Sequence, residues 1–218
     1  MKTIAIAMAK GGVGKTTIAA ALSVRAAKDF KRVAMLDLNR DQANLTQWWH
    51  LRNDPENPQL FTDHNDLVED LPVLEAEGWD VCILDTPPSY LDLIETSVMM
   101  ADAVLLPIKS SIFDAGSLEP VVEMCRKRRK PFAFVLSDLD QRFKTLNAEV
   151  AASLKEDGPV LSARVSHLQS YIVAPNTGKT GAEIDKRAAG EIDALWSEAM
   201  KLAGICKARR RKGVRVHG

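Results

Sequence analysis

The sequence predicts an α/β fold, with a doubly wound and mostly parallel sheet flanked by helices. Three observations support this prediction. Short apolar runs recur along the chain and are continuous rather than alternating, as expected of strands that helices cover on both faces. Amphipathic helical patterns separate these runs, and a glycine-rich loop joins the first run to the first helical pattern. Because folds of this class bind ligands beyond the carboxyl ends of their strands, the functional site is expected there.

Strands and helices are expected in regular alternation. The apolar runs predict strands at residues 3–9, 32–38, 80–85, 103–108 and 131–137, with a weaker sixth strand at 159–165. The helical patterns cover residues 16–28, 44–51, 66–77, 91–100, 117–129, 146–155 and 181–207. The stretch 52–66 contains two prolines and is expected to be an irregular surface loop.

Length and composition indicate one globular unit. The 218 residues suffice for one sizeable core and are few for two, so we expect a single domain at 1–206 and a basic C-terminal tail at 207–218. With 46% hydrophobic and 27% charged residues the composition is ordinary, and no apolar run approaches the roughly 18 residues of a membrane span. The three cysteines form no CxxC pair, which favours a cytoplasmic location over a disulfide framework or a structural zinc site.

The net charge of zero is unevenly distributed. Residues 1–100 hold 9 Lys and Arg against 15 Asp and Glu, whereas residues 101–218 hold 20 against 14. Two basic clusters stand out in the second half, at 126–130 and 207–215. Such clusters occur both as solvated helix ends or tails and as surfaces that bind polyanions, and composition alone does not separate these two roles.

The stretch MAKGGVGKTT at residues 8–17 has the pattern of a phosphate-binding loop between a strand and a helix. Its three glycines allow successive backbone amides to point at phosphates, where a Cβ atom would obstruct the turn. In this pattern Lys15 contacts the β- and γ-phosphates, the Thr16 hydroxyl binds Mg²⁺, and the helix N-terminus adds its positive dipole. The expected nucleotide-binding residues are Lys10, Gly11, Gly12, Val13, Gly14, Lys15, Thr16 and Thr17.

The full string KGGVGKTT also resembles the deviant Walker A motif of the ParA/MinD ATPases, a branch of the P-loop proteins. The resemblance implies the P-loop NTPase fold, with ATP and Mg²⁺ as cofactors. In that family the first lysine, here Lys10, reaches the phosphates that a second subunit binds. Lys10 is therefore expected to act much as an arginine finger does, and a homodimer is expected in the ATP state. Lys10 and Lys15 are both candidate catalytic residues.

Three carboxylates follow predicted strands. Asp85 begins the stretch DTPPS, resembles the Walker B aspartate and is expected to hold a water molecule of the magnesium shell. Asp37 is a further candidate for the catalytic and metal sites. Relatives usually carry a second aspartate two residues later, but this chain has Asn39, and an amide cannot serve as a general base. We therefore expect weak ATP hydrolysis, unless Asp41 substitutes.

The resemblance also implies partners and a function. ParA-type proteins bind DNA nonspecifically as ATP dimers, and a ParB-like partner releases them by stimulating hydrolysis. Nonspecific binding requires Lys and Arg side chains that face phosphates. The expected function is the partition of a plasmid, a chromosomal region or another cargo on the nucleoid. The candidate DNA contacts are Arg209, Arg210, Arg211, Lys212 and Arg215 in the tail, and Arg126, Arg128 and Arg129 in the other cluster.

Two other functions on the same fold compete with this expectation. A MinD-like protein would grip membrane through a C-terminal amphipathic helix, but the apolar stripe from Ile184 to Ala203 is more typical of packing onto the sheet. A metabolic enzyme similar to dethiobiotin synthetase would need a substrate pocket that no motif indicates. The segment 170–185 resembles the loop that lies against the adenine in relatives, which makes Pro175 and Asn176 candidate base contacts.

Overall fold

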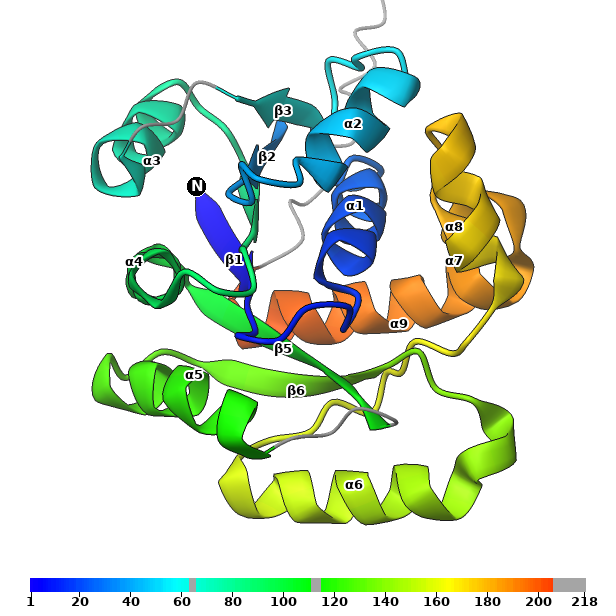
Figure 1. Cartoon of the computed structure of the whole chain (residues 1–218). Helices are drawn as coiled ribbons and strands as arrows, with labels where there is room; N and C mark the ends of the chain where they lie inside the picture. The colour runs from blue at the N-terminus through cyan, green and yellow to red at the C-terminus, as the bar shows by residue number, and fades with distance from the viewer. Residues whose placement is uncertain (63–65, 111–114, 206–218) are drawn as a thin grey trace, which may run out of the picture.

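The computed structural model describes residues 1–62, 66–110 and 115–205. Parallel strands form one six-stranded sheet in the order β3-β2-β4-β1-β5-β6 (Figure 1). The strands are β1 (Lys2–Ile6), β2 (Val33–Asp37), β3 (Gln59–Phe61), β4 (Val81–Asp85), β5 (Ala103–Lys109) and β6 (Phe132–Ser137). The predicted fold class is confirmed.

Helices cover both faces of the sheet. One face packs against α3 (Leu67–Ala76), α4 (Leu91–Met100), α5 (Ala115–Lys127) and α6 (Lys144–Asp157). The other packs against α1 (Lys15–Ala26), α2 (Asn44–Leu51) and α9 (Lys186–Leu202). Successive strand residues point to opposite faces, so Ile4 and Ile6 pack with α1 and α9 while Ala5 packs with the other layer. Because both faces are buried, the strands appear in the sequence as continuous apolar runs.

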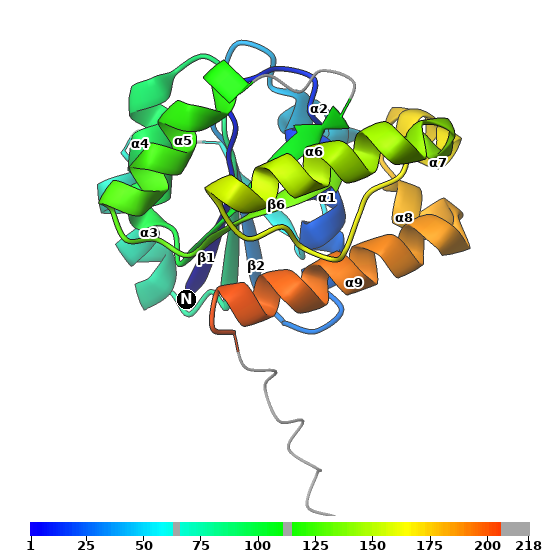
Figure 2. The same cartoon turned by 90° about the horizontal axis from the view of Figure 1, so that it is seen from below.

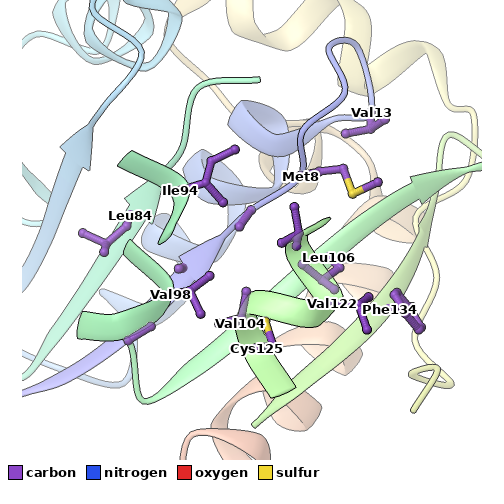
Figure 3. Close-up of a cluster of buried hydrophobic side chains, with 14 of the residues drawn as sticks. Met8, Val13, Leu84, Ile94, Val98, Val104, Leu106, Val122, Cys125 and Phe134 are labelled. Carbon is purple, nitrogen blue, oxygen red and sulfur yellow. The ribbon is translucent and has the colours of Figure 1, made fainter. Parts of the chain in front are cut away.

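The core beneath α4 and α5 extends to the glycine-rich loop. Figure 3 shows Met8 and Val13 at one end of this cluster, which continues past Leu106 to Cys125 and Phe134. The side chain of Val13, between Gly12 and Gly14, is 3% exposed and belongs to this core. Packing of Val13 into the core therefore holds the glycine-rich loop in place.

The stretch 52–66, expected to be an irregular loop, was predicted wrongly in part. It contains β3, which pairs in parallel with β2 at the edge of the sheet. The strand follows the cis peptide bond Asn57-Pro58 and has three residues, of which Leu60 alone is buried. A strand this short carries no readable period, so its pairing with β2 decides its structure.

The weak sixth strand predicted at 159–165 is not formed. Val160 and Ser166 make isolated bridges to Phe134 and Leu139, at the two ends of this stretch. In its middle, the amides of Ser162 and Ala163 donate instead to the carboxylate of Glu198 on α9, at 3.0 and 2.8 Å. The amides of Leu161 and Val165 still donate to the Phe134 and Leu136 carbonyls of β6, so the pairing is interrupted only in the middle of the segment.

The long helix predicted at 181–207 is divided. Its first turn is a separate short helix, α8 (Gly181–Ile184), and Asp185 follows in an extended conformation. The Asp185 carboxylate caps α9 by accepting from the amides of Arg187 and Ala188. Ile184 is 47% exposed and does not belong to the apolar stripe, which packs inward as predicted at its other positions in α9. Two short elements before α8 were not predicted, α7 (Gln169–Val173) and the 3₁₀ helix η3 (Ala174–Thr177).

The parallel strands bring the candidate residues to one edge of the sheet. Asp37 and Asp85 end neighbouring strands and are partners in register. The glycine-rich loop follows β1 at the same edge, and Figure 2 shows it at the top, opposite the N-terminus and the end of α9. Across residues 1–62, 66–110 and 115–205, no helix is both long and apolar enough to cross a lipid bilayer.

Candidate functional site

The glycine-rich loop is closed on itself. Gly12 and Gly14 have φ values of 73° and 90°, a left-handed conformation that residues with a Cβ rarely adopt. The Ser137 hydroxyl, at the end of β6, donates to the Val13 carbonyl at 2.7 Å. The Nζ atom of Lys15 donates to the Lys10 carbonyl at 2.8 Å, so the lysine spans the loop that a phosphate would enter. These two hydrogen bonds and the two left-handed glycines together give the loop its curled shape.

Two buried charges lie beside this loop. Lys15 is 7% exposed and Asp85 is 1% exposed. Burial lowers the pKa of Lys15 to about 8, although the Asp85 charge acts in the opposite direction. Burial raises the pKa of Asp85 to about 7; Thr16 opposes this rise, Asp37 adds to it and Lys15 opposes it. An anion next to Lys15 and a cation next to Asp85 would stabilise the charged forms of both groups.

The chemistry of Asp85 fits a magnesium ion. Both carboxylate oxygens are buried and neither has a hydrogen-bond partner of normal geometry among the described residues. The Thr16 hydroxyl approaches closely enough to lower the Asp85 pKa without completing such a bond. Magnesium takes few protein oxygens and keeps waters and substrate phosphates in its shell. Thr16 and Asp85 would hold the ion, which would neutralise charge on the phosphates.

Asp37 caps a helix, a role that the sequence did not indicate. Its Oδ1 atom accepts from the Asn39 amide at 3.1 Å. Its Oδ2 atom accepts from the amide and the hydroxyl of Thr46, in the first turn of α2, at 2.9 and 3.0 Å. Ala43, the residue before α2, provides no side-chain cap, so Asp37 replaces it from a distance. A direct contact between Asp37 and a cation would compete with these hydrogen bonds.

The two residues expected at the water-activating position differ in environment. Asn39 is 8% exposed, and its side-chain amide donates to Gln42 Oε1 at 3.4 Å. Asp41 is exposed and accepts a 2.6 Å hydrogen bond from the hydroxyl of Tyr90, the residue before α4. This bond and the Asp41 charge raise the pKa of Tyr90. Asp41, the suggested substitute for a base, thus links the loop after β2 to the loop after β4.

A cleft of about 340 Å³ opens beside Thr16 and Thr17. One wall belongs to α2 and the other to residues 175–181. Pro175 and Asn176, which the sequence suggested as base contacts, lie in this second wall. Because the cleft adjoins the start of α1, a nucleotide whose phosphates occupy the loop would place its nucleoside here. The cleft is lined further by Ala20, Asn44, Gln47, Trp48, Leu51, Lys179, Thr180 and Gly181.

The candidate DNA-binding residues that the structure describes lie away from this site. The cluster at 126–130 ends α5 just before β6 begins, and hence at the amino edge of the parallel sheet. Arg126 donates to the Asp157 carbonyl at 2.6 Å, and Arg128 pairs with Glu95 at 2.8 Å. Arg129 is exposed. The tail candidates Arg209, Arg210, Arg211, Lys212 and Arg215 lie outside the described residues.

Several residues around the site were not identified from the sequence. Ser137 acts through one hydrogen bond to a residue 124 positions away, and Thr46 through two hydrogen bonds to Asp37, and neither arrangement leaves a motif. Glu183 could have been identified from the sequence, because Thr180 and Glu183 have the spacing of a capping box. They form one in the structure. The remaining residues, Trp48 and Arg52, contact the far wall of the cleft.

Comparison with known proteins is consistent with this geometry. A family model described as the CobQ/CobB/MinD/ParA nucleotide binding domain matches residues 4–181. The chain is 29% identical to the maintenance of carboxysome distribution protein A of Halothiobacillus neapolitanus, over 91% of this chain and 96% of that protein. It is 28% identical to the chromosome-partitioning ATPase Soj of Thermus thermophilus, over 91% and 98%. The septum site-determining protein MinD of Pyrococcus horikoshii, solved with Mg-ADP, superposes with a TM-score of 0.71 at 20% identity, over 95% of this chain and 99% of that one.

Proposed function

The chain belongs to the CobQ/CobB/MinD/ParA family of nucleotide-binding domains, as a P-loop ATPase of the ParA/MinD type, and we propose that it is an ATP-dependent dimerising switch. In this proposal each chain binds ATP and Mg²⁺ at the loop after β1. Two loaded chains then associate face to face through their nucleotide sites. The observation that carries the proposal is the curled phosphate loop with Lys10 immediately before its paired glycines.

The dimer would supply a charge that one chain lacks. Lys15 lies within the loop and serves the nucleotide of its own chain. The partner's Lys10 would approach the same triphosphate from the other side and stabilise charge on the phosphoryl group that is transferred. Since Asn39 stands where relatives carry an aspartate, hydrolysis is slow, and the ATP dimer has a long lifetime. Asp41 could replace the missing base only by leaving Tyr90.

The proposed role in cargo positioning is based on the similarity to named relatives. Two of them are named for carboxysome distribution and for chromosome partitioning, which supports a role in positioning a cargo. We propose that the dimer binds nucleoid DNA nonspecifically and that a ParB-like partner stimulates hydrolysis. Residues 1–206 would form the ATPase domain and the tail at 207–218 would carry most of the DNA contacts. The tail is favoured because Arg126 and Arg128 already bind Asp157 and Glu95.

Packing of the last helix argues against membrane binding through that helix. Ile192, Leu195, Trp196 and Ala199 are at most 1% exposed and belong to the core with α1 and the sheet. Insertion of this stripe into lipid would expose the core that it covers. The described part of the chain therefore gives no support to a MinD-like membrane function through α9.

Light scattering coupled to size exclusion tests the dimer. The wild type is expected to be a dimer with ATP and a monomer with ADP, and Lys10→Ala a monomer with both. Lys28→Ala is a matched control, because Lys28 is exposed near the end of α1, away from the loop. A dimer that forms without regard to nucleotide, or one that survives in Lys10→Ala, would contradict the proposal.

DNA binding is tested separately. Filter binding to duplexes of unrelated sequence is expected to require ATP, to weaken steeply with salt and to be lost when residues 207–218 are removed. Binding that is equal with ADP, or unaffected by salt, would rule out the proposed DNA switch.

A further inference from the structure

An arginine joins the two walls of the nucleoside cleft. Arg52, the residue after α2, donates to the Gly178 carbonyl at 3.0 Å. Its guanidinium also makes two parallel hydrogen bonds of 2.8 Å to the two carboxylate oxygens of Glu183. The Arg52 and Glu183 side chains are 21% and 24% exposed, so solvent screens this pair only in part. Bidentate pairs of this kind are both strong and directional.

Further contacts tie the same two segments together. The Trp48 ring nitrogen donates to the Lys179 carbonyl at 3.1 Å, and the Arg52 guanidinium lies 5.5 Å from the centre of the Trp48 ring. Glu183 also accepts from the amide and hydroxyl of Thr180, at 2.7 and 3.0 Å. Consecutive carbonyls at 178 and 179 are therefore held by side chains of α2 and of the residue that follows it, while Glu183 connects Arg52 to the start of α8.

The backbones of the two walls are in direct contact at Gly178. This glycine has a φ of +67°, and a Cβ atom placed on it would lie 2.3 Å from the Leu51 carbonyl oxygen. The segment could not lie so close to α2 with any other residue at this position. Trp48 and Leu51 line one wall of the cleft and Lys179 and Thr180 the other, so these contacts fix the width of the cleft.

We propose that Arg52 is a positioning residue for the nucleoside, which holds the cleft open in its binding form before a nucleotide arrives. The proposal rests on the assignment of this cleft to the nucleotide. Arg52 does not line the cleft itself and acts through Trp48, Gly178 and Glu183. When a binding-competent form is populated only in part, the apparent affinity falls by the same fraction. Loss of Arg52 would therefore weaken binding of the nucleoside and leave binding of the phosphates unchanged.

The test compares a nucleotide with its phosphates alone. Isothermal titration of MgADP and of magnesium tripolyphosphate is carried out on wild type, Arg52→Gln and Arg52→Lys. Arg52→Gln is expected to lower the affinity for ADP about tenfold, as a tenfold fall in the competent fraction would give, and to change tripolyphosphate affinity by less than about twofold. Arg52→Lys keeps the charge but cannot bridge both oxygens, so an intermediate loss is expected.

Controls separate this effect from general destabilisation. Arg187→Gln is the matched variant, because Arg187 also faces a glutamate, Glu191 at 3.4 Å, and does not line the cleft; its ADP affinity should equal that of wild type. If Arg52→Gln does not fold, as judged by circular dichroism, Glu183→Gln tests the same link. Equal losses for ADP and tripolyphosphate, or no loss for ADP, would overturn the proposal. A wild type that binds neither ligand would instead refute the proposed function.

Discussion

Replacement of Gly178 by alanine should separate backbone strain from contact between the cleft walls. Gly204, at the end of α9, has nearly the same backbone conformation, with a φ of +65° against +67° at Gly178. A Cβ atom at Gly204 meets nothing within 4 Å, whereas at Gly178 it would meet the Leu51 oxygen at 2.3 Å. Both alanine variants therefore carry the cost of a left-handed residue, and Gly178→Ala alone carries the clash.

The magnitudes follow from these contacts. A left-handed alanine costs about 1 kcal/mol, which is the whole expected loss for Gly204→Ala. At Gly178 the new atom needs at least 3.0 Å, so the walls must separate by about 0.7 Å. That shift would weaken the hydrogen bonds that the 178 and 179 carbonyls accept from α2, each worth about 1 kcal/mol. Gly178→Ala should therefore lose about 3 kcal/mol of unfolding free energy.

Urea unfolding and ADP titration of both variants provide the assay. Gly204→Ala should retain wild-type affinity for ADP, because α9 ends far from the cleft at the other edge of the sheet. Gly178→Ala should bind ADP at least about fivefold more weakly, since its cleft is displaced. Equal losses of stability in the two variants would refute the reasoning about contact. Normal ADP affinity in a destabilised Gly178→Ala would refute the link between these walls and the nucleoside.

Three further predictions concern hydrolysis, the phosphate loop and acid stability. Asn39→Asp should raise ATP turnover, measured as phosphate release, because it would place a general base at this position; an unchanged rate would contradict the proposal that Asn39 limits hydrolysis. Ser137→Ala leaves the Val13 carbonyl without its partner and should cost about 1–3 kcal/mol in urea unfolding; full stability would show that another group replaces the hydroxyl. Burial raises the pKa of Glu183, but the contacts with Arg52 and Thr180 outweigh burial and hold that pKa below its usual value. The carboxylate therefore contributes its full stability above the pKa of the unfolded chain, and this contribution disappears as the pH falls through the lowered pKa. Glu183→Gln should accordingly be less stable than wild type near pH 7 and approach it near pH 3, whereas a pH-independent difference would contradict the cause.

The strands could be predicted where burial on both faces produces a continuous apolar run in the sequence. Val33 to Asp37 and Val81 to Asp85 are buried at every position, which gives apolar runs that no helix of ordinary amphipathicity would show. At 159–165 the same apolar signal was misleading in part. The amides of Leu161 and Val165 donate to β6, but Glu198, on a helix 36 residues beyond Ser162, accepts from the amides of Ser162 and Ala163. An apolar run indicates that a segment is buried, but it does not indicate which acceptor each backbone amide will bind.

The candidate site was likewise predictable from the sequence in one part and not in another. The left-handed conformations of Gly12 and Gly14 belong to a contiguous motif, so the sequence alone indicates the phosphate loop. The link between Arg52 and Glu183 spans 131 residues and uses two of the commonest charged side chains. No spacing connects such a pair before the fold is known. The family resemblance suggested Pro175 and Asn176 at the nucleoside end of the cleft. The link that joins their wall to α2, in contrast, is visible only in three dimensions.

Helix α2 connects Asp37 to the wall that we propose receives the nucleoside. Asp37 holds the amino end of the helix through Thr46, beside the carboxylate of Asp85. Trp48 and Arg52 hold the 178–179 carbonyls at the other end. An eight-residue helix is about 12 Å long and behaves as a rigid rod over that length. Any nucleotide state that draws Asp37 away from Thr46 must therefore uncap α2 or move it, and movement of α2 displaces the wall that receives the nucleoside.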